Sequence, residues 1–185
     1  FMKGMVRKFV AAATLALVVG AGGAALDAKP LRVNVVADPA QMDPITYSEI
    51  VSGRILRNVY EGFTEVQPDG TVKPALAERW ETLQNPPGFR FHLRKTAKFH
   101  SGRPFTAKDV KYTLETLLIP ASKGGLSVPY LANIIGADDV KAGKTTSLAG
   151  VKIVDDNTVE ITFTKPEVLF PIYPIWYMDS GIVAE

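Results

Sequence analysis

Cysteine is absent from this chain of 185 residues. Without it no disulfide framework can form, and no thiol is present to carry the lipid that anchors some exported proteins to a membrane. Histidine is nearly absent as well: His92 and His100 are the only two, and neither lies in an H-E-x-x-H arrangement. A zinc site of standard spacing is therefore not supported. We expect structural or surface roles for both histidines, and no cofactor.

Motifs of catalysis are also missing. The chain contains neither a G-x-S-x-G nucleophile elbow nor a G-x-x-x-x-G-K-[ST] phosphate-binding loop. No serine or carboxylate has the spacing to a base that nucleophilic catalysis would need. We therefore do not expect an enzyme. A secreted hydrolase would require a nucleophile or metal site that the sequence does not present.

Residues 2–28 have the three-part pattern of a secretory signal peptide. Three basic residues stand near the start, residues 9–19 are almost entirely apolar, and small residues dominate positions 20–28. We expect this segment to be removed on export, after Ala28 or after Ala25; the alternative is an uncleaved membrane anchor. Without an attached lipid, the expected location is the periplasm of a Gram-negative cell.

The excess of positive charge belongs to this segment. The whole chain has a formal charge of +2, and residues 1–28 contain three basic residues and one acidic residue. The chain without them is neutral, so it lacks the basic character that binding to nucleic acid would need.

Hydrophobic periodicity predicts a mixed α/β fold in which hairpins and helices are interspersed. The predicted strands lie at residues 31–37, 63–66 with 71–72, 80–83 with 89–93, and 151–154 with 158–163. The predicted helices lie at residues 47–60, 74–78, 107–119 and 129–135. Thr106 precedes the third helix, where Asp109 imitates a capping box with a shorter acid. Trp80 and the phenylalanines near it are expected in the core.

An ordered series of local motifs runs through these elements. They are DP (43–44), NVYEGF (58–63), PALAERW (74–80), FRFHLR (89–94) and KFHSGRPFTAKDV (98–110). In this order they resemble the dipeptide- and oligopeptide-binding proteins of bacterial ABC importers, which are the family 5 extracellular solute-binding proteins. The resemblance extends from about Leu31 to the end of the chain.

This resemblance implies a periplasmic-binding-protein fold of type II that is incomplete here, because family members are much longer. Residues 29–62 are expected to begin the main lobe. Residues 63–174 are expected to form the extra subdomain typical of the family, and residues 175–185 to begin the return to the main lobe. The second lobe is expected to be absent.

The resemblance also implies a ligand site. In this family the pocket lies between two lobes that close around the solute. One wall comes partly from the segment just after the Asp-Pro motif, which here is Tyr47, Ser48, Glu49 and Ile50. A tyrosine that follows the central helix also lines the pocket in oligopeptide-binding relatives, and Tyr130 matches it in kind. For both groups the alternative is a packing role within the fold.

The implied function is binding without covalent chemistry. A monomeric periplasmic protein would capture a peptide or related small solute and deliver it to an ABC permease in the inner membrane. Family members also carry nickel chelates, haem, glutathione, opines and sugars, so the resemblance does not identify the solute. Because the second lobe is expected to be absent, this chain is expected to bind the solute weakly or not at all. The alternative is a truncated lobe without a transport role that acts as a structural or interaction protein.

Overall fold

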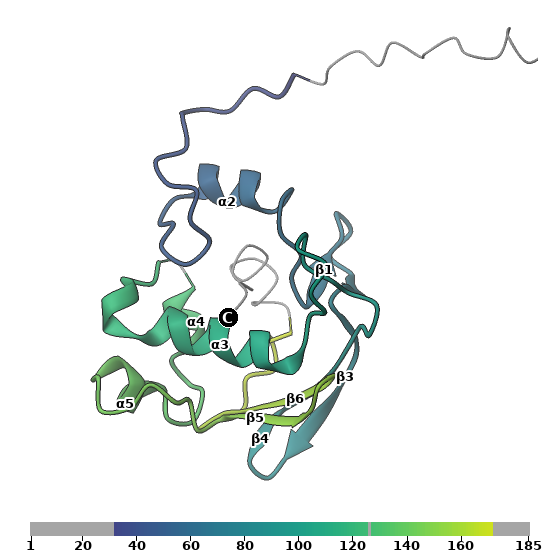
Figure 1. The fold of residues 1–185 in the computed structure, drawn as a ribbon, viewed down its shortest axis with the longest axis vertical. Helices are drawn as coiled ribbons and strands as arrows, with labels where there is room; N and C mark the ends of the chain where they lie inside the picture. The colour runs from purple at the N-terminus through teal and green to yellow at the C-terminus, as the bar shows by residue number, and fades with distance from the viewer. Residues whose placement is uncertain (1–31, 126, 172–185) are drawn as a thin grey trace, which may run out of the picture. The chain divides into compact units, whose positions relative to one another are not determined.

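A four-stranded antiparallel sheet forms the centre of the fold in the computed structural model, which describes residues 32–125 and 127–171 (Figure 1). The strand order is β3-β4-β6-β5, with β3 at Ala77–Gln84, β4 at Pro87–Leu93, β5 at Val151–Asp155 and β6 at Thr158–Thr162. Two predicted hairpins, β3–β4 and β5–β6, are thereby confirmed, and they join through their inner strands. The described residues from Val35 onward belong to one unit. The predicted signal peptide (residues 2–28) and the predicted return segment (175–185) lie outside the described residues.

Strand β4 has one apolar and one polar face, as its alternating sequence predicts. Phe89, Phe91 and Leu93 are buried, whereas the residues between them are only half-buried. Phe91 lies opposite Val159 of β6. Apolar side chains from both inner strands therefore cover the same face of the sheet.

Helix α3 (Ala107–Leu118) packs against this face. Its contact stripe consists of apolar residues at helical spacing that are at most 3% exposed: Val110, Leu114, Leu117 and Leu118. The predicted capping box is confirmed, since the Asp109 carboxylate accepts a hydrogen bond of 2.7 Å from the Thr106 amide. The same carboxylate is fully buried and accepts a bond of 2.6 Å from Arg103. These contacts fix the residue at which the helix begins.

Aromatic rings form a cluster in the core. Phe63 stacks on Phe91 with ring centroids 4.9 Å apart, and Phe163 lies 4.6 Å from Phe170. The Phe91 and Phe170 rings connect the two pairs at 6.4 Å, and each of these rings is at most 1% exposed. The sequence predicts Trp80 in the core as well, but it is only partly buried because β3 is an edge strand.

Short elements surround this core. They are the hairpin β1–β2 (Thr64–Val66 and Val72–Pro74), a 3-10 turn at Pro120–Ser122, and helices α2 (Ile50–Leu56), α4 (Val128–Leu131) and α5 (Ala137–Lys141). The β1–β2 hairpin is confirmed. Helix α4 is shorter than the predicted helix at 129–135, and α5 is missing from the prediction because five residues carry too little periodicity to be recognised.

The predicted helix at residues 74–78 is wrong. Ala75 and Ala77 donate their backbone N–H groups to the carbonyl of Phe63, at 3.1 and 2.8 Å. The segment therefore ends β2 at Pro74, bends at Ala75 and Leu76 and begins β3 at Ala77, with its amides bonded to a neighbouring segment. Proline at a first-turn position is only a weak local signal, and hydrogen bonds between segments override it.

Two predictions before the sheet are also corrected. The described part of the predicted first strand, residues 32–37, has no strand partner among the described residues, and Val36 is 92% exposed. A strand without a neighbour leaves its backbone groups unpaired and is not stable alone. The helix predicted at 47–60 is limited to α2, because Glu49 caps its start and the backbone after Leu56 turns more tightly.

Candidate functional site

Tyr47, the first residue of the predicted ligand wall, is buried. It is only 2% exposed, and its ring packs on α2 at Gly53, where an added Cβ would lie 3.1 Å from the ring. The Tyr47 amide donates to the Asp43 carbonyl at 3.1 Å, and the Asp43 carboxylate accepts a bond of 2.7 Å from the Ile45 amide. The DP motif and Tyr47 together form a tight turn held against the helix. A direct contact between Tyr47 and a solute stays a prediction.

The turn that ends at Tyr47 touches the segment that leads to Tyr130. Gly125 donates its backbone N–H to the Ile45 carbonyl at 3.0 Å, and its own carbonyl accepts from the amide of Val128 at 3.4 Å. Val128 begins α4, on which Tyr130 is half-buried. In Figure 1 the loop before α2 reaches the segment that leads into α4. The fold thus brings two predicted groups, which are far apart in sequence, onto neighbouring segments.

Glu49 is the N-cap of α2. Its carboxylate accepts hydrogen bonds from the Ser52 hydroxyl, from the Ser52 amide at 2.9 Å and from the Ala40 amide at 3.2 Å. The bond from the Ser52 hydroxyl, followed by the bond from the Ser52 amide, lowers the pKa of Glu49 below its ordinary value of 4.5, because both favour the charged form. Both carboxylate oxygens already accept bonds from the chain itself, so Glu49 supports the wall as a helix cap.

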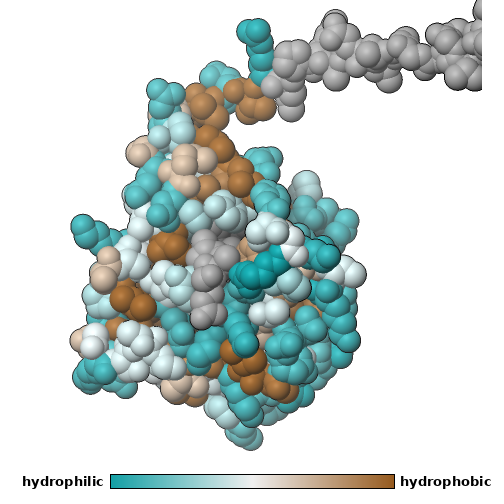
Figure 2. Space-filling model, in the orientation of Figure 1, coloured by the Kyte–Doolittle hydropathy of each residue, from teal (hydrophilic) through white to brown (hydrophobic). Residues whose placement is uncertain are grey.

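Ser48 and Ile50 are the most solvent-accessible of the predicted site residues. Ser48 is exposed, and Ile50 is 69% exposed. Val36 and Met42 are exposed nearby in the sequence, and residues coloured as hydrophobic gather over this part of the molecule in Figure 2. A contact between this exposed surface and a solute stays a prediction.

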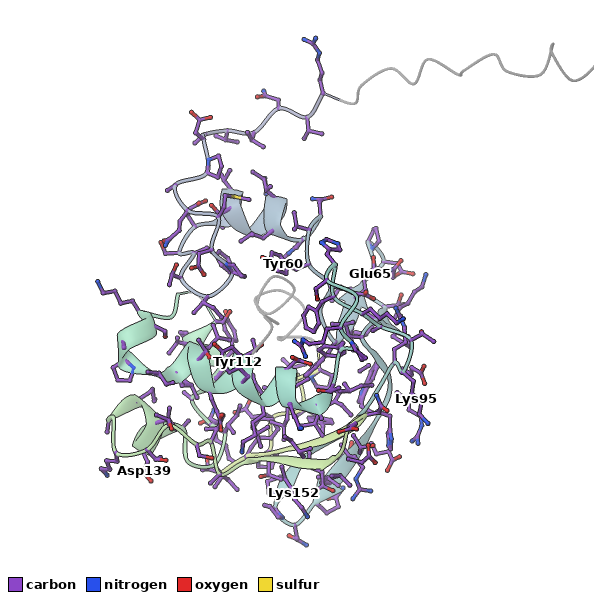
Figure 3. All side chains as sticks on the ribbon, in the orientation of Figure 1. Tyr60, Glu65, Lys95, Tyr112, Asp139 and Lys152 are labelled. Atoms are coloured by element: carbon purple, nitrogen blue, oxygen red, sulfur yellow. The ribbon has the colours of Figure 1, made fainter. Side chains whose placement is uncertain are left out.

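A cleft that the sequence does not indicate lies beyond the C-terminal end of α2. Its volume is about 500 Å³, and its lining includes Tyr60, which Figure 3 labels, together with Phe99 and His100. Arg94 and Glu61, which also line the cleft, form an ion pair of 3.1 Å. In sequence, the KFHSG motif that contributes to this cleft indicates only a turn. None of the predicted wall residues is part of the described lining.

The outer face of the sheet carries a ladder of alternating charges. Arg90 bonds to Glu160 at 2.9 Å through its Nε atom, and Glu81 pairs with His92 at 2.9 Å and also with Arg79. The bond from Arg79, followed by that from His92, lowers the pKa of Glu81. His92 lies on the polar face of β4, as the alternating sequence predicts, with its Nε2 atom 2.9 Å from a Glu81 carboxylate oxygen.

Two features are absent from the described residues. No group of three or more His, Cys, Asp or Glu side chains there could hold a metal ion. No helix there is both long enough and apolar enough to cross a membrane.

Comparison with known proteins assigns the chain to a family. Residues 71–180, more than half of the chain, match the family described as "Bacterial extracellular solute-binding proteins, family 5 Middle". The chain belongs to this family. The motifs at 74–80, 89–94 and 98–110, which suggested the family from sequence, all lie within the matched residues.

The similarity of this family 5 protein to individual relatives leads to the same assignment. It is 35% identical over 149 residues to the probable deoxycholate-binding periplasmic protein YgiS of Escherichia coli, covering 78% of the chain and 28% of YgiS. It is 32% identical over 161 residues to the periplasmic oligopeptide-binding protein OppA of Salmonella typhimurium, covering 84% of the chain and 29% of that protein. The structure of Haemophilus influenzae OppA in complex with RPPGFSPFR is similar with a TM-score of 0.65 at 28% identity, over 72% of the chain and 26% of that structure.

The chain therefore spans less than a third of the length of the relatives it matches. Over the part that it covers, the fold is that of the type II periplasmic binding proteins, as the sequence predicts.

Proposed function

We propose that this chain is part of the periplasmic substrate-binding component of an ABC importer. The component captures a peptide or related small solute by lobe closure and delivers it to a permease in the inner membrane, acting as a monomer. Membership of the solute-binding family and similarity to periplasmic peptide-binding proteins support this proposal.

The observation that carries the proposed site is the contact between the turn at 43–47 and the segment before α4. Gly125 bonds to Ile45 at 3.0 Å, so residues 47–50 and Tyr130 belong to segments that touch. We assign the solute wall to Tyr47, Ser48, Glu49, Ile50 and Tyr130. In this wall, Ser48, Ile50 and Tyr130 would meet the solute, whereas Tyr47 and Glu49 would hold the segment in shape.

The domain assignment is also part of the proposal. Residues 29–62 begin the main lobe, residues 63–174 form the extra subdomain, and residues 175–185 begin the return to the main lobe. The boundary near Gly62 rests on secondary structure alone: among the described residues, α2 is the only helix or strand before Gly62 and the four-stranded sheet follows it, while the residues from Val35 onward pack as one unit.

Two measurements on the whole product of this gene test the proposal. The protein is recovered from a periplasmic extract, its intact mass is determined, and native mass spectrometry is run with dialanine, trialanine, penta-alanine and deoxycholate. We expect a mass well above that of this chain, a monomer, and binding of at least one peptide.

A product with the mass of residues 29–185 that binds none of these probes would contradict the proposal. The chain would then be better explained as a lobe with a structural or interaction role. Binding of deoxycholate alone would keep the importer and correct the solute class.

A further inference from the structure

Two adjacent glycines, Gly124 and Gly125, lie where the segment before α4 makes its closest approaches. Neither has a backbone torsion φ in the positive range that L side chains avoid. Their lack of a side chain is therefore a matter of space and not of backbone conformation. The two positions can be compared directly, because a substitution to alanine at either one would place a new Cβ against the backbone of a different neighbouring segment.

Gly125 is in contact with the turn of the predicted wall. A Cβ built on it would lie 1.9 Å from the carbonyl oxygen of Tyr47 and 3.0 Å from that of Thr46. Real Cβ atoms essentially never come within 3.0 Å of such an atom, so the Tyr47 carbonyl would have to retreat by about 1 Å. The same residue donates the 3.0 Å hydrogen bond to Ile45.

Gly124 instead contacts the end of α3. A Cβ on it would lie 2.2 Å from the carbonyl oxygen of Leu117 and 2.7 Å from the side chain of Val128. Its nearest neighbours therefore belong to the helices that flank the segment. The two substitutions to alanine would impose clashes of similar severity, but only one of them would act on the turn at 43–47.

We propose that Gly125 is a positioning residue of the solute wall. Its missing side chain lets the turn at 43–47 approach α4, and this approach sets the spacing between residues 48–50 and Tyr130. The inference rests on the proposed function of those segments.

A displacement at Tyr47 would be transmitted to the wall by the contacts around it. The Tyr47 ring packs on Gly53 of α2, and Glu49 caps the same helix while it bonds to the Ala40 amide. The turn at 43–47 and the start of α2 are therefore expected to move together. Pushing the Tyr47 carbonyl away from Gly125 would shift Ser48 and Ile50 relative to Tyr130, although Gly125 itself touches no solute.

The test compares the whole gene product with its Gly124→Ala and Gly125→Ala variants. Unfolding by urea, exchange of the Gly125 amide, and the affinities for dialanine and penta-alanine are measured for each. Both variants should lose stability. Only Gly125→Ala should weaken solute binding by about tenfold, the effect of losing one well-made hydrogen bond, and it should change the ratio of the two affinities.

Equal losses of affinity in both variants, with an unchanged ratio, would overturn the positioning role and indicate a general effect on stability. Unchanged binding by Gly125→Ala would overturn it as well. A Gly125 amide that exchanges as fast as an open loop in the unsubstituted protein would remove the contact on which the inference depends. If the unsubstituted protein binds neither peptide nor deoxycholate while this amide is protected, the proposed function fails and the contact has only a packing role.

Discussion

Residues 35–60 expose many of their large apolar side chains, whereas the described residues of 63–163 expose few of theirs. Val36, Ile50 and Val59 are more than half exposed in the first region, and among the described residues of the second only Tyr112 and Val154 are exposed large apolar residues. In Figure 3, Tyr112 marks α3, the helix that covers the sheet. The first region has a capped helix and a tight turn, but no sheet to receive its apolar surface.

This difference shows that a local start signal and a buried apolar face are separate requirements for a stable helix. Helix α2 begins where Glu49 caps it, yet its residue Ile50 is open to solvent. Helix α3 has both a capping box and a buried stripe. Most of the stability of a helix in a protein comes from such a buried face and not from its caps.

The largest effect is expected from removing a ring of the aromatic cluster. Phe91→Ala should lower the free energy of unfolding by about 3–5 kcal/mol, because Phe91 is fully buried and contacts Phe63 and Phe170. Ile50→Ala in α2 should change it by no more than about 0.5 kcal/mol. Urea unfolding followed by circular dichroism measures both. If both variants lost the same free energy of unfolding, Ile50 would be buried in solution and the two regions would not differ in burial.

An intermediate effect is expected in hydrogen exchange of the unsubstituted chain. Amides of β4 and α3 should be protected roughly 100-fold more than those of α2, because opening α2 exposes little apolar surface. Exchange monitored by NMR at neutral pH gives the comparison amide by amide. Uniform protection across the two regions would show that they unfold as one cooperative unit.

The smallest effect concerns the Glu49 cap. Because its folded pKa lies below the ordinary value of 4.5, the ionised Glu49 contributes stability that is fully present above that value and lost as the pH falls through the folded pKa. The Ser52 amide should therefore exchange faster, after correction for intrinsic rates, as the pH drops below about 4.5.

Glu49→Gln should remove this pH dependence. Asp69→Asn is the matched control, since hydrogen bonds from Thr71 lower the pKa of Asp69 in the β1–β2 turn. That variant should leave the exchange of Ser52 unchanged. If it altered Ser52 as strongly as Glu49→Gln does, the acid response would be a property of the whole unit and not of the α2 cap.

Elements whose signals lie close together in sequence were predictable. The hairpin at 151–162 needs only two alternating runs and a turn, and the capping box needs only Thr106 and Asp109 three residues apart. The helix predicted at 74–78 failed because its backbone bonds to Phe63, a partner that periodicity does not reveal. The strand predicted at 31–37 failed in its described part because alternation alone does not supply a neighbouring strand.

The candidate site divides in the same way. Resemblance to the family indicated the segments around Tyr47 and Tyr130, and these segments prove to be neighbours. The burial of Tyr47 and the close approach of Gly125 depend on contacts between segments far apart in the chain. A glycine before a helix predicts only a flexible loop, so nothing local distinguishes Gly125 from Gly124.

The pairing of β4 with β6 has a consequence for how the chain folds. Leu93 donates to the Asn157 carbonyl at 2.7 Å, so the two inner strands close a long loop at its base, and that loop contains α3, α4 and α5. Each hairpin can form from nearby residues, but joining them must overcome the entropy of closing the loop. We therefore expect the two hairpins and α3 to form early and the pairing of β4 with β6 to form last. Until β4 and β6 pair, the segment that carries Gly125 has no fixed position from which to shape a binding wall.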